Sequence, residues 1–505
     1  MRKLTLVCFL VLAGAGAATL LTEPDMDSDL PVIYWSTDPN PARIRQVDQF
    51  HEWLVDNGHT TLDGRPNVEL RLETVAADRK GIIQGVSGVA ADIMDCNIPW
   101  YQSIGILADV TEAADRDGFG LDSTYEALEP LLTVDGRQYG FPCNVYVMGL
   151  WVNVDTFTKL DMEPPPTHWD WDTFERIGKE FVQRANPAGQ RQTVFFVNRI
   201  EHAFFVRAMH RSLGVSDFNE TMTASGLDHA GFAETLARIR KWTFEDHIAA
   251  SKAEETAFSA ESGYSGAGLT LLKKGNYGIY VIGRWALIRL RQFEKPPRVS
   301  ASHFPHGGFP NTLISARTAA VYAGSPHLAE AKLFLAYLAS EVYNIGIVES
   351  ADAMPPIPEF TRTEAYLRPV AHPNEWGSHE VPAQGAESIA ITLSTSPFVP
   401  SATVDRYKKR ALEQVMAGLT TPEQAAAEAA SRIDAEIQLT LVDSPTMRRR
   451  YARAVALQEK IDGYRQMGRP IPMEWIKNPF HRAYYRSKGW TEYDIAECNT
   501  GGKGV

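Results

Sequence analysis

The stretch that decides the fold is DGRQYGFPCNVYVMGLWVNVDTF, from Asp135 to Phe157. A turn with glycine and proline leads into an apolar run typical of a buried strand, and Asn144, Tyr146 and Asn153 interrupt that run. Polar groups inside an apolar interior need hydrogen-bond partners. We expect these partners to be either neighbouring backbone or a bound ligand.

Upstream of this stretch, strand and helix patterns alternate. VIYWST at 32–37 predicts a strand, and RIRQVDQFHEWLVDNG, ending at Gly58, predicts an amphipathic helix. NVELRLETV and ADIMDC predict two more strands, with a helix at 79–86 between them. This order predicts an open α/β sheet with parallel crossovers. Ligands of such sheets bind beyond the carboxyl ends of the strands, here Trp35–Asp38 and Asp95–Trp100.

Later in the chain, start signals predict several packed helices. Ser325 and Pro326 precede one apolar helix, and Thr421 precedes Pro422 with Gln424 at the spacing of a capping box. Ser444 and Pro445 start a polar helix within a final segment of different, aromatic-rich character. We interpret this final segment as an appendage that packs on the body.

Length and charge narrow the possible classes of protein. The chain has 505 residues, more than one hydrophobic core usually supports, so we expect at least two lobes. With 44% hydrophobic and 22% charged residues it has a globular composition. The net charge of −12 argues against a chain-wide nucleic-acid binder, and only Arg448–Arg453 is locally basic.

The N-terminus has the architecture of an export signal. Arg2 and Lys3 precede an apolar run rich in small residues, which predicts a signal peptide cleaved after Ala15 or Ala17. The run is also almost long enough to remain as a membrane anchor. Cys8 lacks the small residue that precedes a lipidated cysteine, so we predict no lipidation there.

Motifs for metal and covalent chemistry are missing from the sequence. Cys96, Cys143 and Cys498 lack zinc-ligand spacing, and we predict that the first two are free thiols rather than a disulfide. The sequence has no Gly-x-Ser-x-Gly elbow, phosphate loop or His-Glu-x-x-His motif. We therefore predict no cofactor and no metal. A glycosidase pair of carboxylates stays open, because its geometry is set in space.

Aromatic residues are the more informative feature. Several lie near predicted strand ends or turns, where an exposed ring can stack on an apolar sugar face while amides and carboxylates bind its hydroxyls. They are Trp35, Trp100, Tyr101, Tyr146, Trp151, Trp169, Trp171 and Trp285.

These features, in this order, resemble family 1 extracellular solute-binding proteins of ABC importers, the group that includes maltose-binding protein. The matching segments are AADIMDC, GILADVT, the opening stretch, PPPTHWDWDTFERIGKEF, LLKKGNYGIYVIGRWALIRL, AVYAGSPHLAEAKLFLAYLAS, AMPPIPEF and VMAGLTTPEQAAAEAA. They cover about residues 31–440. The chain departs from the family in lacking a lipobox cysteine and in its tail after residue 440.

The resemblance implies an α/β, two-lobed periplasmic-binding-protein fold of type II, with a ligand cleft between lobes that three hinge segments join. In this interpretation the WDWD segment at 169–172 opens a helix, with an aspartate as its cap. The implied parts are a signal peptide or anchor at 1–22, lobe one at 30–141 plus 314–341, lobe two at 146–312 plus 342–440, and a helical extension at 441–505.

The resemblance also implies ligand contacts. Trp285 matches the stacking tryptophan of lobe two, and Asn144 and Tyr146 line the floor of the cleft. Asn144 has an alternative role, in which it only ties the crossing strand to neighbouring backbone. The remaining candidates are Trp35, Asp38, Asp95, Asn97 and Trp100 on lobe one, and Phe196 and His202 on lobe two.

The implied function is capture of a sugar or oligosaccharide by hinge closure and its delivery to ABC permease subunits in the membrane. We expect an extracytoplasmic monomer without nucleic-acid partners and without enzymatic activity. Polyols and glycerol phosphodiesters remain open as ligands. The alternatives are an exported glycosidase or lyase, and a ligand-loaded sensor that engages a receptor.

Overall fold

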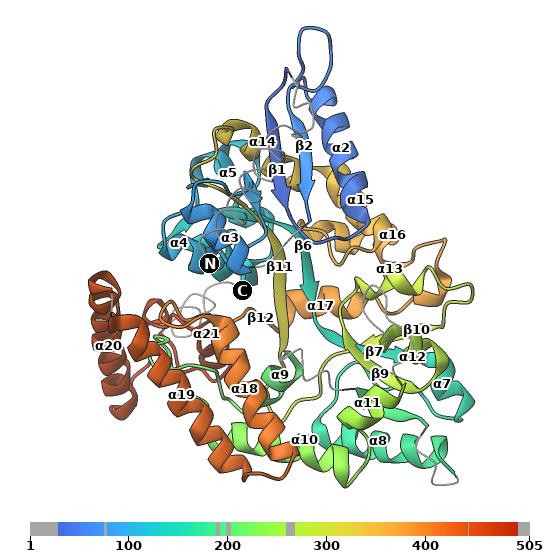
Figure 1. The fold of residues 1–505 in the computed structure, drawn as a ribbon. Helices are drawn as coiled ribbons and strands as arrows, with labels where there is room; N and C mark the ends of the chain where they lie inside the picture. Colours follow the sequence, from blue (N-terminus) through green and yellow to red (C-terminus); the bar gives the residue numbers. More distant parts are fainter. Residues whose placement is uncertain are drawn as a thin grey trace, which may run out of the picture.

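Figure 1 shows a two-lobed molecule in which long strands join an upper and a lower lobe. The lower lobe carries a flank of long helices that includes α19 (Pro422–Val442) and α20 (Pro445–Gln466). The predicted signal segment at 1–22 lies outside the described residues. The computed structural model describes residues 29–74, 78–187, 192–197, 204–258, 268–442 and 444–492.

Lobe one is built on the parallel strands that the sequence predicts. β1 (Val32–Ser36) pairs in parallel with β2 (Glu69–Glu73) on one side and with β3 (Ile93–Met94) on the other. The amphipathic run forms α2 (Ala42–Asp56), whose inward residues recur every three or four positions. They are Arg43, Gln46, Phe50 and Leu54. The α/β prediction for this lobe is confirmed.

The opening stretch crosses from one lobe to the other. β6 (Gly140–Val147) pairs antiparallel with β11 (Thr312–Val321) in the sheet of lobe one. β7 (Gly149–Asn153) follows at once, but it pairs with β9 (Tyr277–Ile282) and β10 (Val299–Ser302) in a second sheet. Figure 1 shows β6 and β11 side by side between the lobes. This strand pair is therefore part of the hinge.

Asn153 has a structural role at the end of this crossing. Its Oδ1 accepts a hydrogen bond from Thr156 N at 3.0 Å, which caps α7 (Val154–Lys159), and its Nδ2 donates to Leu272 O. One of the three polar interruptions in the opening stretch is thus fully explained by neighbouring backbone.

Several predicted helix caps are present. Asp170 Oδ1 accepts from Thr173 N at 2.8 Å and caps α8 (Trp171–Ala185), which confirms the interpretation of the WDWD segment. Thr421 Oγ1 accepts from Gln424 N at 3.2 Å, and the Gln424 side chain accepts from Thr421 N at 3.4 Å, as a capping box requires.

The start signal at Ser325 predicts the helix slightly too early. α14 begins at Leu328 and ends at Ala339, and the side chain of its N-cap residue, His327, makes no capping hydrogen bond. Ser325 Oγ instead accepts from His327 N at 2.9 Å and donates to Asp92 Oδ1 at 2.5 Å. The serine is used to tie the turn to lobe one, so it is not free to cap the helix.

A third crossing joins the lobes after α15 (Glu341–Ser350). That helix packs against α2 and α14, and α16 (Glu364–Leu367) packs against α15, so residues 342–367 lie with lobe one and not with lobe two as expected. α18 (Ser401–Met416) packs against α10 (Ala230–Phe244) of lobe two. Between them, β12 (Ala390–Ile391) pairs with the start of β11, so this segment also belongs to the hinge.

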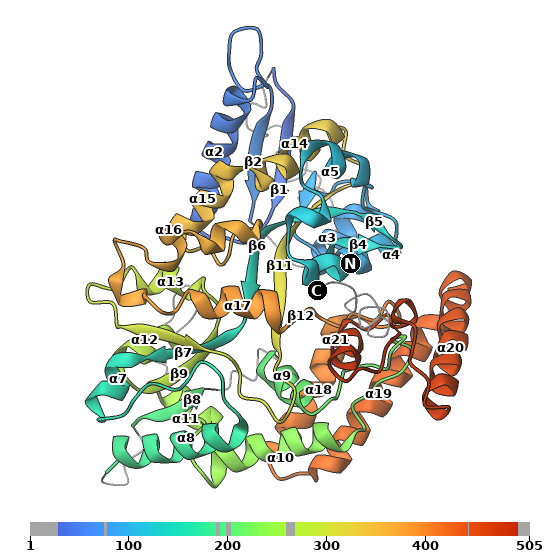
Figure 2. The same ribbon diagram turned by 180° about the vertical axis from the view of Figure 1, so that it is seen from behind.

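The C-terminal extension is docked on lobe two. Its helices are α20 and α21 (Pro479–Ser487), and Figure 2 shows α21 between α20 and the body of the protein. The buried Glu220 of lobe two accepts from Arg465 and Tyr485 of the extension, and its backbone oxygen accepts from Lys477 N and Asn478 N at 2.8 and 2.9 Å. The extension is therefore joined to lobe two through a buried hydrogen-bonded residue.

Cys96 and Cys143 are buried thiols that are not joined in a disulfide, which confirms that prediction. In the part of the chain that the structure describes, no single helix has both the length and the apolar character to cross a membrane. Only the pair α14 and α15 meets that criterion, jointly and with a 60° bend between the two helices.

Candidate ligand-binding site at the hinge

The strand pair β6 and β11 has one polar and one apolar face. Side chains alternate along paired strands, and Asn144 lies opposite Arg317 while Tyr146 lies opposite Ser315. These four side chains share the face that we call the hinge front. The intervening residues share the other face, the hinge rear, and belong to or pack on one hydrophobic cluster of lobe one. They are Val145, Val147, Ile314 and Ala316.

An ion network joins the hinge front to the carboxyl ends of β1 and β3. Arg317 Nη1 contacts Asp95 Oδ2 at 2.6 Å, and its Nη2 contacts Asp38 Oδ2 at 3.3 Å. Arg43 Nε contacts the other Asp38 oxygen at 2.8 Å, and its Nη1 contacts Asp352 Oδ2 at 2.6 Å. The network brings together three carboxylates and two guanidinium groups.

Asp95 and Arg317 are the members of this network that reach the surface. Their side chains are 18% and 35% exposed. Burial raises the pKa of the Asp95 carboxyl, and the guanidinium of Arg317 counteracts that effect. Thr318 N also donates to Asp95 Oδ1 at 3.1 Å. The pair can therefore present both an acceptor and a donor to a ligand.

The aromatic ring of Tyr146 belongs to the hinge front, and the ring of Trp285 lies beside it. Tyr146 meets Trp285 edge to face, with 5.4 Å between the ring centroids and an angle of 77° between the planes. Both rings are only partly buried. Burial raises the pKa of the Tyr146 hydroxyl, so it remains a hydrogen-bond donor at neutral pH. An open ring beside a hydroxyl fits a ligand that has apolar faces and hydroxyl groups.

Arg284 holds the turn that carries Trp285. It is fully buried, and its Nη1 and Nη2 donate to Ala353 O at 2.6 Å and Val348 O at 3.1 Å, beside the third crossing. A Cβ at Gly283 would lie 1.8 Å from the Trp285 ring, so only glycine allows the ring to fold back over this position. The orientation of Trp285 is thus set by its two preceding residues.

The structure brings together five of the predicted ligand contacts on or beside the hinge front: Asp38, Asp95, Asn144, Tyr146 and Trp285. Asn144 is the least explained of these. Its Oδ1 is buried and accepts no hydrogen bond from any described residue. A buried acceptor without a partner is costly, so we expect a ligand or ordered water to complete this position.

Other predicted contacts have structural roles. Trp35 is fully buried in the core of lobe one, 4.8 Å from the ring of Phe334, and Phe196 is fully buried in the core of lobe two. These two predictions are corrected, because neither ring reaches solvent. Asn97 caps α4 (Ile98–Ser103) by accepting from Trp100 N at 3.0 Å.

The structure does not place the last two predicted ligand contacts at the hinge front. Trp100 is partly buried against the lobe-one cluster, and His202 lies outside the described residues.

The sequence interpretation missed Arg317, Arg43 and Asp352. The signal for Arg317 was present, because an arginine inside the apolar strand TLISARTAAV requires a partner.

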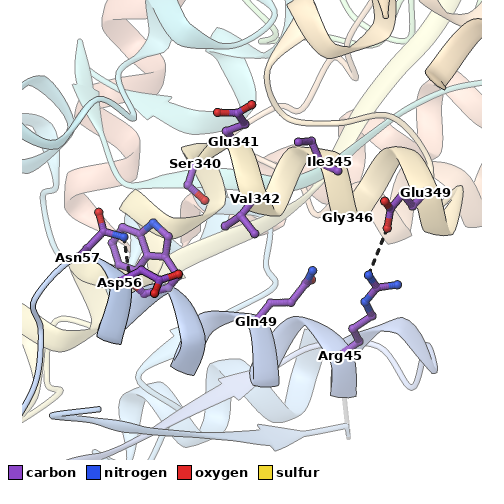
Figure 3. Close-up of a pocket in the computed structure, with 11 residues that line it drawn as sticks. Arg45, Gln49, Asp56, Asn57, Ser340, Glu341, Val342, Ile345, Gly346 and Glu349 are labelled. Carbon is purple, nitrogen blue, oxygen red and sulfur yellow. Dashed lines mark hydrogen bonds and ion pairs between the residues drawn. The ribbon is translucent and has the colours of Figure 1, made fainter. Parts of the chain in front are cut away.

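A groove of about 520 Å³ lies between α2 and α15 on lobe one. Figure 3 shows the side chains that line it and the ion pair of Arg45 and Glu349, 3.1 Å apart, at one end. None of the predicted site residues lines this groove. Within the described ranges, no group of three or more histidine, cysteine or acidic side chains is placed to hold a metal ion.

Comparisons with known proteins agree with this architecture. The sequence profile of the bacterial extracellular solute-binding proteins matches residues 64–345. A lactose-binding protein from Rhizobium radiobacter is 27% identical over 221 residues, which are 41% of this chain and 48% of that protein. The chain therefore spans about half the length of this curated relative.

Solved structures show the same fold. An ABC substrate-binding protein from Listeria monocytogenes in complex with cycloalternan is 18% identical, with 81% of this chain and 100% of that chain covered and a TM-score of 0.67. A sugar-binding protein from Xanthomonas citri is 12% identical, with 81% and 98% covered and a TM-score of 0.66. At these identities the likeness establishes the two-lobed fold. Since the family profile spans more than half of the chain, this protein belongs to the bacterial extracellular solute-binding proteins.

Proposed function

We propose that this protein captures a neutral sugar or oligosaccharide at the hinge front, outside the cytoplasm, and delivers it to an ABC permease. The observation that carries the proposal is the placement of Asp95 and Arg317 beside the Tyr146 and Trp285 rings on one face of the hinge. The names of the relatives support the ligand class, because they describe proteins that bind lactose or were solved with cycloalternan.

The charges of the site favour a neutral ligand. The carboxylates of Asp38, Asp95 and Asp352 all have a guanidinium partner in the network. A neutral polyhydroxyl ligand can bond to these groups without leaving a charge unpaired, whereas a charged ligand would compete with an existing ion pair. Trp285 and Tyr146 supply the apolar surface that stacks on a sugar ring.

The proposed mechanism is hinge closure. The strands β6, β11 and β12 connect two lobes with separate sheets, so the lobes can rotate about this narrow connection. A ligand that contacts both lobes stabilises the closed form. To move the equilibrium from 1:99 to 99:1 it must bind that form about 5.5 kcal/mol more tightly than the open form. No cofactor is needed, and we propose that the protein acts as a monomer.

The competing proposals are an enzyme that cleaves the same carbohydrate and a sensor that presents it to a receptor. A binding protein returns its ligand unchanged, whereas a glycosidase or lyase consumes it. Incubation of the protein with each ligand that binds, followed by chromatography of the recovered sugar, separates binding from catalysis. A pull-down with permease subunits separates delivery from signalling.

Calorimetry and thermal shift with a panel of neutral sugars, oligosaccharides, uronates and polyols test the proposal. We expect a neutral saccharide to bind and Trp285→Ala to weaken its affinity about 10- to 100-fold, because the ring loses its contact area with the sugar. Trp490→Ala is the control, because Trp490 is half-exposed on the extension. Equal affinities for the two variants, or binding by none of the panel, would contradict the proposal.

Arg317→Met should weaken the same ligand about 10-fold or more and make its affinity fall as the pH decreases. The guanidinium is the group that counteracts the effect of burial on the Asp95 pKa, so its loss raises that pKa further and favours the protonated carboxyl. Titration calorimetry across the pH range measures both effects. Arg45→Met removes an exposed ion pair, to Glu349, that is not part of the ion network at the hinge front, and should leave affinity unchanged.

A further inference from the structure

A second groove, of about 910 Å³, spans both lobes and the extension. Lobe one contributes residues 124–130, the hinge contributes 386–392, lobe two contributes Gly308–Pro310, and α21 contributes one wall. A groove with walls from both lobes must change width when the lobes rotate.

This groove lies behind the hinge. Tyr125 and Ala386 line it, and both belong to the hydrophobic cluster that contains Val145, Val147 and Ile314 of the hinge rear. The candidate ligand contacts lie on the opposite face of the same strands. The strands form the axis between the two faces. A lobe rotation that narrows the rear groove therefore moves the lobes apart at the hinge front, and a rotation that closes the lobes at the hinge front widens the rear groove.

Apart from Arg362 and Glu387, which pair with each other at 2.8 Å, charges of opposite sign line this groove on the two sides that move relative to each other. Glu126 and Glu129 belong to lobe one, and Arg482 and Lys488 belong to the extension. No ion pair is formed by any of these four side chains within the described ranges. In the observed conformation the two pairs of charges therefore line the same groove without direct contact, and their attraction grows as the groove narrows.

α21 is rigidly attached to lobe two, so its charges follow that lobe. Asn478 at its start is fully buried and bonds through Nδ2 to Phe218 O and Ser216 Oγ, both at 2.9 Å. Phe480 is fully buried, with its ring 5.7 Å from the guanidinium carbon of Arg211. Attraction between α21 and lobe one therefore acts as a torque between the lobes.

We propose that α21 is an interlobe latch. Arg482 and Lys488 pair with Glu126 and Glu129 when the rear groove narrows, and these pairs stabilise the form in which the hinge front is open. The latch sets how much of the ligand's binding free energy is used to close the lobes. This inference rests on the proposed function only where it links the closed form to ligand binding.

The latch is tested without ligand, by distance measurements between two spin labels. Glu112→Cys on α5 (Thr111–Asp117) and Lys159→Cys on α7 place one label on an exposed site of each lobe. Cys8→Ser and Cys498→Ser remove native thiols outside the described residues, and Cys96 and Cys143 are buried.

The variant Arg482→Glu with Lys488→Glu should shift the ratio of closed to open forms about two- to tenfold toward closed, the range expected for two exposed ion pairs. Adding Glu126→Lys and Glu129→Lys should restore the original distances, because the charges again attract. High salt should also shift the native protein toward the closed form, because it screens the attraction between these exposed charges. The Debye length is about 3 Å at 1 M salt.

Arg448→Glu with Arg449→Glu on α20 makes the same change in net charge outside the groove and should leave the distances unchanged. Identical distance distributions in the native and reversed variants would overturn the latch, whatever the protein binds. If the reversed variant shifts but the panel of saccharides does not bind, the latch stands and the proposed function fails. Thermal melting of each variant verifies that it is folded.

Discussion

Asp217→Asn is expected to lower the free energy of unfolding by about 3–5 kcal/mol. Asp217 is buried in lobe two, where Lys408 Nζ lies 3.1 and 2.9 Å from its two oxygens and Arg207 Nε lies 3.0 Å from one of them. Burial alone would raise its pKa, but Lys408 and Arg207 hold the pKa of Asp217 well below the usual range. The amide would leave the two buried cations with only the partly exposed carboxylate of Asp405 as an anionic partner.

Urea denaturation at neutral pH measures this loss, and Asp405→Asn is the matched control. Asp405 contacts the same two cations, with Arg207 Nη2 2.8 Å and Lys408 Nζ 3.2 Å from its Oδ1, but its side chain is 44% exposed. Solvent can replace it, so its loss should be no more than about 1 kcal/mol. Similar losses for the two variants would show that burial is not what makes the Asp217 contacts strong.

The protein should lose stability steeply as the pH falls from about 6.5 to about 4. Burial lowers the pKa of four histidines to about 4. In the unfolded chain they take up protons near pH 6.5, while the folded protein keeps them neutral. The unfolded state therefore binds more protons throughout this interval. The four are His210, His303, His379 and His481.

For each of these histidines, the free energy of unfolding falls by about 1.4 kcal/mol per pH unit below the unfolded pKa. The stability that the neutral histidine contributes is fully lost once the pH reaches the folded pKa. Together they can remove most of the 5–15 kcal/mol that is typical of a folded protein. Urea midpoints between pH 7.5 and 4.5 give the slope of the free energy of unfolding against pH. His481→Gln should reduce that slope by about 1.4 kcal/mol per pH unit, the contribution of one proton. A stability that is constant down to pH 5 would contradict the prediction.

The local features of the fold were the most predictable. The amphipathic run at α2 and the caps at Asp170 and Thr421 depend on residues within one or two turns of each other, so their spacing in the sequence is also their spacing in space. The same reasoning failed at Ser325, because Asp92, 233 positions away, engages its hydroxyl. The distant contact overrode the local signal.

The candidate site was predicted only in part, and for a related reason. Trp35 and Trp285 both lie beside strand ends, yet Trp35 is fully buried and Trp285 is not. An alternating pattern tells which residues share a face of a strand, but when both faces are covered it does not tell which one meets solvent. Only packing separates a core ring from a ring that is open to a ligand.

By itself the sequence determined the α/β class, a buried strand within 140–153 and the buried thiols, because strand periodicity, turn chemistry and composition are local properties. That this strand crosses between the lobes was implied only by the family resemblance. The tertiary structure alone decided that Arg317 pairs with Asp95 across 222 positions, that Glu220 receives the extension, and that α21 faces the rear of the hinge. Charges and hydroxyls find their partners in space, and chain separation says nothing about which partners those are.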